Sequence, residues 1–199
     1  SATAFREKAV SLVLAGGLAG AVIGPSLATR TQHWLPVTFA GAYVALAAVA
    51  LLSMLAIAFM TFPPVPPRAA HAERGRPLGE IMRQPIFIVA AGCAALGYGV
   101  MNLLMAATPL AMQVCGFPFN DAALVLEWHV IGMFAPGFFT GHLIRRFGAL
   151  TIMGVGVALY LLCIGIALTG VDLHQFLVAL FLLGVGWNFL FTGATTLAM

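Results

Sequence analysis

Six apolar runs, each long enough to form a membrane-crossing helix, are separated by shorter polar stretches. The runs are Ala9–Thr29, Val37–Phe62, Ile86–Met112, Asp121–Ile144, Gly148–Thr169 and Leu173–Met199. A helix needs about 20 apolar residues to cross about 30 Å of hydrocarbon. The runs are unbroken rather than alternating, and a helix satisfies its own backbone hydrogen bonds in lipid. The pattern therefore predicts an all-α membrane protein with six transmembrane helices.

The long polar stretch of the chain, residues 63–84, divides these runs into a first pair and a later group of four. It opens with Pro63, Pro64, Pro66 and Pro67 and continues with charged residues as far as Arg83. Prolines favour an extended, semi-rigid backbone, so we interpret the stretch as a linker between two membrane units. Within it, Gly79–Met82 is expected to form one turn of interfacial helix.

Composition supports the membrane assignment. Apolar residues make up 62% of the chain and charged residues 8%, far from the balance of a soluble domain. The net charge of +3 comes from basic residues in short loops, which is a membrane-orientation pattern and not a nucleic-acid footprint. The three cysteines, Cys93, Cys115 and Cys163, lie far apart, so we expect no zinc site or disulfide framework. The sequence also has no metal-ligand cluster or phosphate loop, so we expect no metal or cofactor. The start without Met and the end inside an apolar run suggest a fragment of a longer protein.

The basic residues also predict which side of the membrane each loop occupies. With six spans, eight of the nine Lys and Arg residues fall on the side of the two termini, and Arg30 falls on the other. The eight are Arg6, Lys8, Arg68, Arg74, Arg76, Arg83, Arg145 and Arg146. Cytoplasmic loops carry the excess of basic residues. We therefore expect an integral protein of a bacterial inner membrane, with both ends of this segment on the cytoplasmic side.

The fourth run contains Glu127, an acid inside a hydrophobic segment. A carboxylate in lipid is costly, so Glu127 is a candidate for proton or substrate coupling; the alternative is an acid near the interface, hydrogen-bonded to another helix. His129 lies about 200° around the same helix, so the two side chains face different ways. Glu127 shares its face with Phe134 and Phe138, whereas His129 shares its face with Gly132, Pro136 and Thr140. A histidine paired with a neighbouring helix is the ordinary alternative for His129.

Two other runs carry polar residues in Gly-rich or Pro-interrupted helices, a pattern that marks binding sites in transporters. The third run holds Tyr98 and Asn102 near its glycines, and the sixth holds Trp187 and Asn188. These four are candidates for a substrate or proton pathway. For the third run, the alternative is a set of packing glycines with an incidental Asn. For the sixth run, the alternative is a hydrogen bond between helices.

The first run spaces Gly16, Gly20 and Gly24 four residues apart and follows them with Pro25. Glycines at that spacing share a helix face and allow a second backbone to come close, while a proline bends the helix. We interpret the motif as a helix-packing seam, with a direct substrate contact as the alternative.

Three features resemble the major facilitator superfamily of secondary transporters. The stretch Gly141–Gly148, which contains Arg145 and Arg146, resembles the family's cytoplasmic signature turn between its eighth and ninth helices. The stretch Gly17–Pro25 resembles the core of its fifth-helix motif, and residues 63–84 resemble the linker between its two six-helix halves. The signature usually has an acid where this chain has Arg145, and the fifth-helix motif usually continues to paired glycines where this chain has Ser26–Thr29.

The resemblance implies helices five to ten of a twelve-helix, two-bundle transporter. Residues 1–62 would then be the last two helices of the N-terminal bundle, residues 63–84 the inter-bundle linker, and residues 85–199 the first four helices of the C-terminal bundle. It also implies alternating access around a central site. The expected partners are the lipid bilayer, a small-molecule substrate and the remaining helices of the full-length transporter.

The leading functional hypothesis is secondary active transport of a small molecule, driven by a proton or solute gradient, and not an enzymatic activity. A channel-like or structural subunit is the first alternative, although the sequence has no selectivity-filter loop. An intramembrane enzyme is the second alternative, but Ser11, Ser26 and Ser53 lie in no Gly-x-Ser-x-Gly nucleophile elbow.

Overall fold

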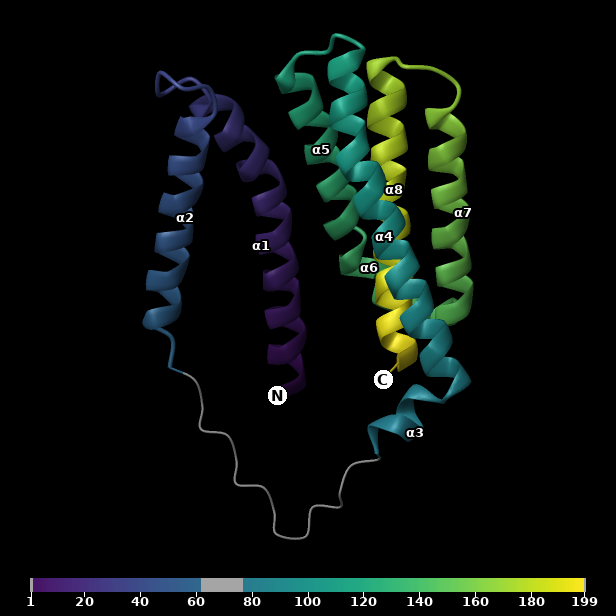
Figure 1. The fold of residues 1–199 in the computed structure, drawn as a ribbon. Coiled ribbons are helices and arrows are strands. Elements are labelled where there is room, and N and C mark those ends of the chain that lie inside the picture. Colours follow the sequence, from purple (N-terminus) through teal and green to yellow (C-terminus); the bar gives the residue numbers. More distant parts are fainter. Residues whose placement is uncertain (1, 62–76, 199) are drawn as a thin grey trace. The chain divides into compact units, whose positions relative to one another are not determined.

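The computed structural model describes residues 2–61 and 77–198, with the side chains of residues 2–12 and 14 left out, and every element in those ranges is a helix (Figure 1). The helices are α1 (Ala2–Thr31), α2 (Ala40–Ala58), α3 (Leu78–Met82), α4 (Pro85–Val114), α5 (Phe119–Phe134), α6 (Gly137–Phe147), α7 (Ala149–Ala167) and α8 (Leu173–Ala198). The predicted all-α class is confirmed.

In the part of the chain that the structure describes, each predicted apolar run contains a helix, except that Asp121–Ile144, predicted as one span, forms two helices. Within the described residues, α2, α4, α7 and α8 are long and apolar enough to cross a membrane. The α5–α6 pair makes a fifth span if it is counted as one, and its two helices meet at a bend of 43°. The run Ala9–Thr29 lies in α1, whose first side chains are outside the described set. Broken spans of this kind need neighbouring helices to satisfy the freed backbone groups.

Two compact units divide the chain, residues 27–83 and residues 1–26 together with 84–199. The first part of the predicted linker, with Arg68, Arg74 and Arg76, lies outside the described residues. Its last part forms the short helix α3, which matches the expected helical turn at Gly79–Met82. The division into bundle-derived segments at 62 and 85 stays a prediction.

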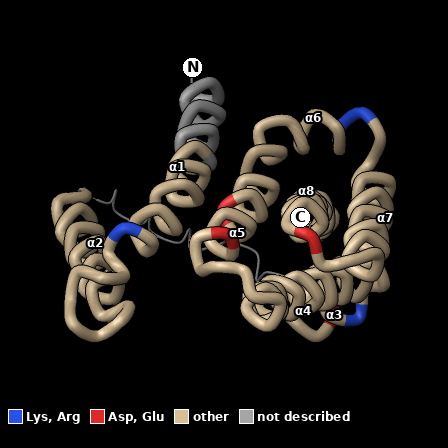
Figure 2. The backbone as a smooth tube through the Cα atoms, turned by 90° about the horizontal axis from the view of Figure 1, so that it is seen from above, with Lys and Arg blue, Asp and Glu red and all other residues tan. Residues whose placement is uncertain are grey.

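Helix α8 is the centre of the larger unit. It packs against α4, α5, α6 and α7, which stand around it when the unit is viewed from above (Figure 2). Two glycines let α8 approach its neighbours. A Cβ on Gly184 would clash with the carbonyl oxygen of His129 in α5, and a Cβ on Gly186 would lie 2.7 Å from the Tyr160 ring of α7. Small residues at such contacts are how helices pack closely in lipid, where the hydrophobic effect does not drive them together.

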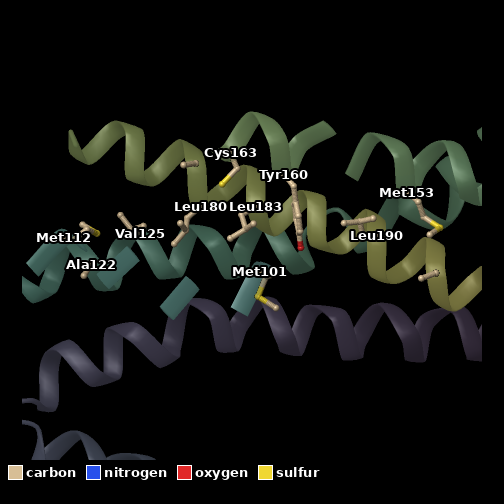
Figure 3. Close-up of a cluster of buried hydrophobic side chains, with 12 residues drawn as sticks. Met101, Met112, Ala122, Val125, Met153, Tyr160, Cys163, Leu180, Leu183 and Leu190 are labelled. Carbon is tan, nitrogen blue, oxygen red and sulfur yellow. The ribbon is translucent and has the colours of Figure 1, made fainter. Parts of the chain in front are cut away.

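The buried side chains of this unit line the α8 contacts. Met101 from α4, Val125 from α5, Cys163 from α7 and Leu183 from α8 belong to one cluster of buried residues (Figure 3). A smaller cluster joins Ile144 of α6, Ile152 of α7 and Phe189 of α8. The two clusters place α5 and α6 against different parts of α8.

Tyr160 forms a hydrogen bond between two helices that flank the central helix α8. Its hydroxyl donates a hydrogen bond of 2.8 Å to the carbonyl oxygen of Gly97 in α4, although Tyr160 belongs to α7. The ring passes Gly186 of α8 on the way, and a larger residue there would obstruct it. Glycine at 186 therefore allows a polar link between two helices that flank α8.

The predicted packing seam of α1 has no close partner in the described structure. A Cβ built on Gly16, Gly20 or Gly24 meets no heavy atom within 4 Å. At the adjacent Gly17, an added Cβ would come within 2.9 Å of the Phe134 ring. The role of the seam, and the bend expected at Pro25, stay predictions.

Candidate functional site

The break between α5 and α6 is caused by Pro136. A proline has no N–H to offer the carbonyl of Gly132, one turn earlier, and its ring disturbs the helix there. Helix α5 ends at Phe134, α6 begins at Gly137, and the carbonyl of Pro136 accepts hydrogen bonds from the backbone N–H groups of Phe139 and Thr140 at 2.9 and 2.8 Å. The break therefore leaves carbonyl groups of the preceding turn in need of other donors.

Asn188 of α8 supplies one of those donors. Its Nδ2 donates to the carbonyl oxygen of Met133 at 2.7 Å, and its Oδ1 accepts from the hydroxyl of Thr140 at 2.6 Å. The Thr140 hydroxyl also lies 2.7 Å from the Pro136 carbonyl oxygen, so its single proton is shared between two acceptors. Asn188 and Thr140 are both buried. We name Asn188, Thr140 and the Met133 carbonyl the polar clamp, which fastens both sides of the break to the central helix.

His129 lies on the same buried side of α5. Its Nδ1 is 2.8 Å from the carbonyl oxygen of Leu180, which can only accept, so Nδ1 is the donor of this hydrogen bond. The side chain is fully buried, and its Nε2 has no hydrogen-bond partner among the described residues. This hydrogen bond joins α5 to α8, and a pathway role for His129 stays a prediction.

The helical face that carries His129 is the packed face of the broken span. His129, Gly132, Pro136 and Thr140 are all buried, whereas Glu127 is half-buried on the other face. The structure therefore keeps Glu127 out of the hydrogen bonds that join His129 and Asn188 to other helices. A coupling role for Glu127 stays a prediction.

The remaining pathway candidates occupy different environments. Tyr98 and Asn102 are exposed on α4 in the described structure. Trp187 is half-buried and stacks on Phe191, one turn further along α8, with ring centroids 4.9 Å apart and planes 10° apart. The structure thus links Asn188 to the break and pairs Trp187 with an aromatic ring, and it leaves Tyr98 and Asn102 apart from both arrangements.

The predicted site residues did not include Phe191 or Tyr160, and Thr140 was named only for the helical face that it shares with His129. The sequence could have indicated Thr140 as a site residue, because it shares the helical face of His129 and follows Pro136 by one turn. The link from Tyr160 to Gly97 joins residues 63 positions apart, so no local pattern announces it.

The signature turn ends helix α6. Gly148 has φ 85° and ψ 151°, a conformation that glycine adopts readily, and its N–H donates to the carbonyl of Ile144 at 2.8 Å. Arg145 and Arg146 lie exposed in the last turn, where positive charge is favourable for the helix dipole. The Arg146 guanidinium lies 5.2 Å from the centroid of the Phe147 ring. Gly141, one turn earlier than Arg145, is exposed and meets no neighbour that a Cβ would touch.

Comparison with known proteins identifies several transporters of similar sequence. The riboflavin transporter RfnT of Brucella anthropi is 42% identical over 196 residues, which cover 97% of this chain and 49% of that protein. Two Bacillus subtilis proteins, the uncharacterized MFS-type transporters YddS and YdeG, are 29% and 30% identical and match 94% and 96% of the chain. The chain spans about half the length of these relatives, and no solved structure matches it.

The family model described as Major Facilitator Superfamily matches residues 2–199, nearly the whole chain. Its match agrees with the all-helical structure and with the candidate membrane spans among the described residues. The chain is therefore an integral membrane protein that belongs to the major facilitator superfamily.

Proposed function

We propose that this chain is part of a secondary transporter that carries a small organic solute across the membrane by alternating access. The observation that carries the proposal is the broken span α5–α6, which is fastened to the central helix by the polar clamp. Interrupted helices with polar groups at the break are where transporters bind substrates and where their helices bend.

The proposal includes helices beyond those of this chain. The relatives are about twice as long, so we infer that the remaining helices complete the pathway. We also propose that the chain lies in a bacterial inner membrane with both of its ends on the cytoplasmic side. The support is the excess of Lys and Arg in the loops on that side and the bacterial source of the relatives.

We propose riboflavin, or a solute with a similar fused aromatic ring, as the substrate, because RfnT is named for riboflavin and matches 97% of the chain. The test uses proteoliposomes that contain the full-length protein and an imposed proton or solute gradient. We expect radiolabelled riboflavin to accumulate inside above its outside concentration. A channel would only equilibrate it, and an enzyme or structural subunit would move none, so either result would reject the proposal.

Proton coupling through Glu127 is a separate proposal with its own test. In the Glu127→Gln variant we expect proton-driven accumulation to fall about tenfold or more and to lose its dependence on pH, because Gln cannot exchange a proton. Exchange of labelled for unlabelled riboflavin should continue, since it needs no net proton movement. Glu80→Gln is the matched control, because Glu80 is an exposed acid in the short helix α3. Wild-type pH dependence in the Glu127 variant would remove this residue from the coupling mechanism.

A further inference from the structure

We propose that Trp187 and Phe191 form a stacking surface for the planar ring system of the transported solute; the proposal rests on the transport function proposed above. The two rings lie nearly parallel on one side of α8. Phe191 is 41% exposed and Trp187 is half-buried, so one side of the stack is open in the described structure.

The position of the stack follows from the register of α8. Trp187 lies seven residues after Leu180, and Phe191 lies seven residues after Gly184, so each pair shares almost the same helical face. Leu180 accepts the hydrogen bond of His129, and Gly184 packs on the backbone of α5. Trp187 and Phe191 therefore lie along the same stripe of α8, the helical face of Leu180 and Gly184, which α5 covers two turns earlier.

Helices α5 and α6 cross α8 and leave this stripe uncovered: Gly132 already lies against Phe181 and Val185, on another face of α8. After the bend, α6 packs Ile144 against Phe189, which lies about 200° around α8 from Phe191. Leu180 is 3% exposed on the covered part of the stripe, compared with 41% for Phe191 beyond it. The polar clamp holds the bend, so it also keeps α6 away from the aromatic pair.

The chemistry of the pair favours a heteroaromatic ring over a hydrocarbon. The indole Nε1 of Trp187 is buried and has no hydrogen-bond partner among the described residues. A buried N–H without an acceptor is unfavourable, and a carbonyl or ring nitrogen of an incoming solute would satisfy it. The N–H is covered by protein atoms in this conformation, so the Trp187 side chain must move when such an acceptor binds.

A fused-ring solute such as riboflavin fits these requirements. Its three-ring system is planar, carries carbonyl and ring-nitrogen acceptors, and can stack on the open face of an aromatic pair. A helix from the rest of the protein is the alternative occupant, and the experiment below separates the two. A packing helix would contact this surface with side chains in many orientations. Its packing would not require an aromatic ring at position 187 or 191.

The test is the kinetics of riboflavin transport by the full-length protein in proteoliposomes. We expect Trp187→Leu and Phe191→Leu each to raise KM on the order of tenfold, as the loss of one aromatic stacking partner does for flat bases. Trp187→Phe keeps a ring and loses only the N–H, so its KM should rise about two- to fivefold. The matched control is Trp128→Leu, because Trp128 is 46% exposed and contacts a single ring, Phe181, edge-on at 6.0 Å; it should leave KM unchanged.

Each outcome decides the proposal. Riboflavin transport by the wild type with an unchanged KM in both leucine variants would overturn the stacking surface and leave the transport function standing. A lower melting temperature with unchanged KM would show a helix-packing contact and would also overturn it. A wild-type protein that neither binds nor moves riboflavin would reject the proposed substrate, and the stacking proposal with it.

A second measurement does not depend on the stability of the leucine variants. Stacking on an indole quenches flavin fluorescence, so riboflavin bound to the purified wild-type protein should lose most of its emission, and Trp187→Phe should recover part of it. Bound riboflavin that keeps its full emission would contradict the stacking surface.

Discussion

Gly184→Ala is expected to be among the most damaging single substitutions in this unit. The added Cβ would clash with the carbonyl oxygen of His129 and lie 3.0 Å from the backbone nitrogen of Met133, and neither backbone atom can rotate away. Helices α5 and α8 must therefore separate, which strains the hydrogen bond from His129 to Leu180. Overpacking of this kind costs about 3 kcal/mol, and more if the bond breaks. We expect the full-length protein to melt several degrees lower in detergent and to transport poorly.

Gly154→Ala is the matched control for this prediction. Gly154 is also a helical glycine of the larger unit, but a Cβ built there meets no heavy atom within 4 Å. The same chemical change should therefore be neutral or slightly stabilising, since alanine favours a helix more than glycine does. Equal melting temperatures for the two variants would show that α5 and α8 are not held at this contact.

Asn188→Leu is expected to have the second large effect, and mainly on transport. Leucine has the same number and branching of side-chain heavy atoms but no polar atoms, so the Met133 carbonyl loses its donor and the Thr140 hydroxyl loses one acceptor. Each hydrogen bond in a membrane contributes about 0.6–2 kcal/mol, which together predicts a loss of about 1–4 kcal/mol. Because the clamp holds the bend at Pro136, we expect the maximal transport rate to fall about tenfold or more while protein remains in the membrane.

A double-mutant cycle isolates the clamp from general damage. Thr140→Val should destabilise the protein alone, and its effect should be smaller when Asn188 is already leucine, with a coupling energy of about 0.5–2 kcal/mol. Thr195→Val is the control, because the Thr195 hydroxyl lies within 3.0 Å of the carbonyls of Phe191 and Thr192 in its own helix. Additive effects of Asn188 and Thr140 would mean that their 2.6 Å contact does not couple the helices.

Part of the candidate site was visible in the sequence. Asn188 and Trp187 were candidates because polar and aromatic residues beside glycines are unusual in a span. The break at Pro136 was not predicted, and Pro25 and Pro109 lie inside continuous helices, so a proline alone does not locate a break. The opposite faces of Glu127 and His129 followed from helical periodicity. The contacts of these groups could not be predicted from the sequence. Their partners Met133, Thr140 and Leu180 are common residue types in a membrane helix and lie about 50 positions away along the chain.

The sequence by itself determined the class of the protein and the approximate positions of its helices, because apolar runs and turn residues act locally along the chain, and its motifs indicated the family. Only the tertiary structure showed that α8 is the central helix and that its glycines allow α5 and α7 to pack closely against it. It also showed that Asn188 holds the break by a hydrogen bond and that Trp187 stacks on Phe191. The physical reason is that the spans are mostly apolar on nearly all sides. Lipid and protein attract such a helix almost equally, so close packing and a few hydrogen bonds select its neighbours.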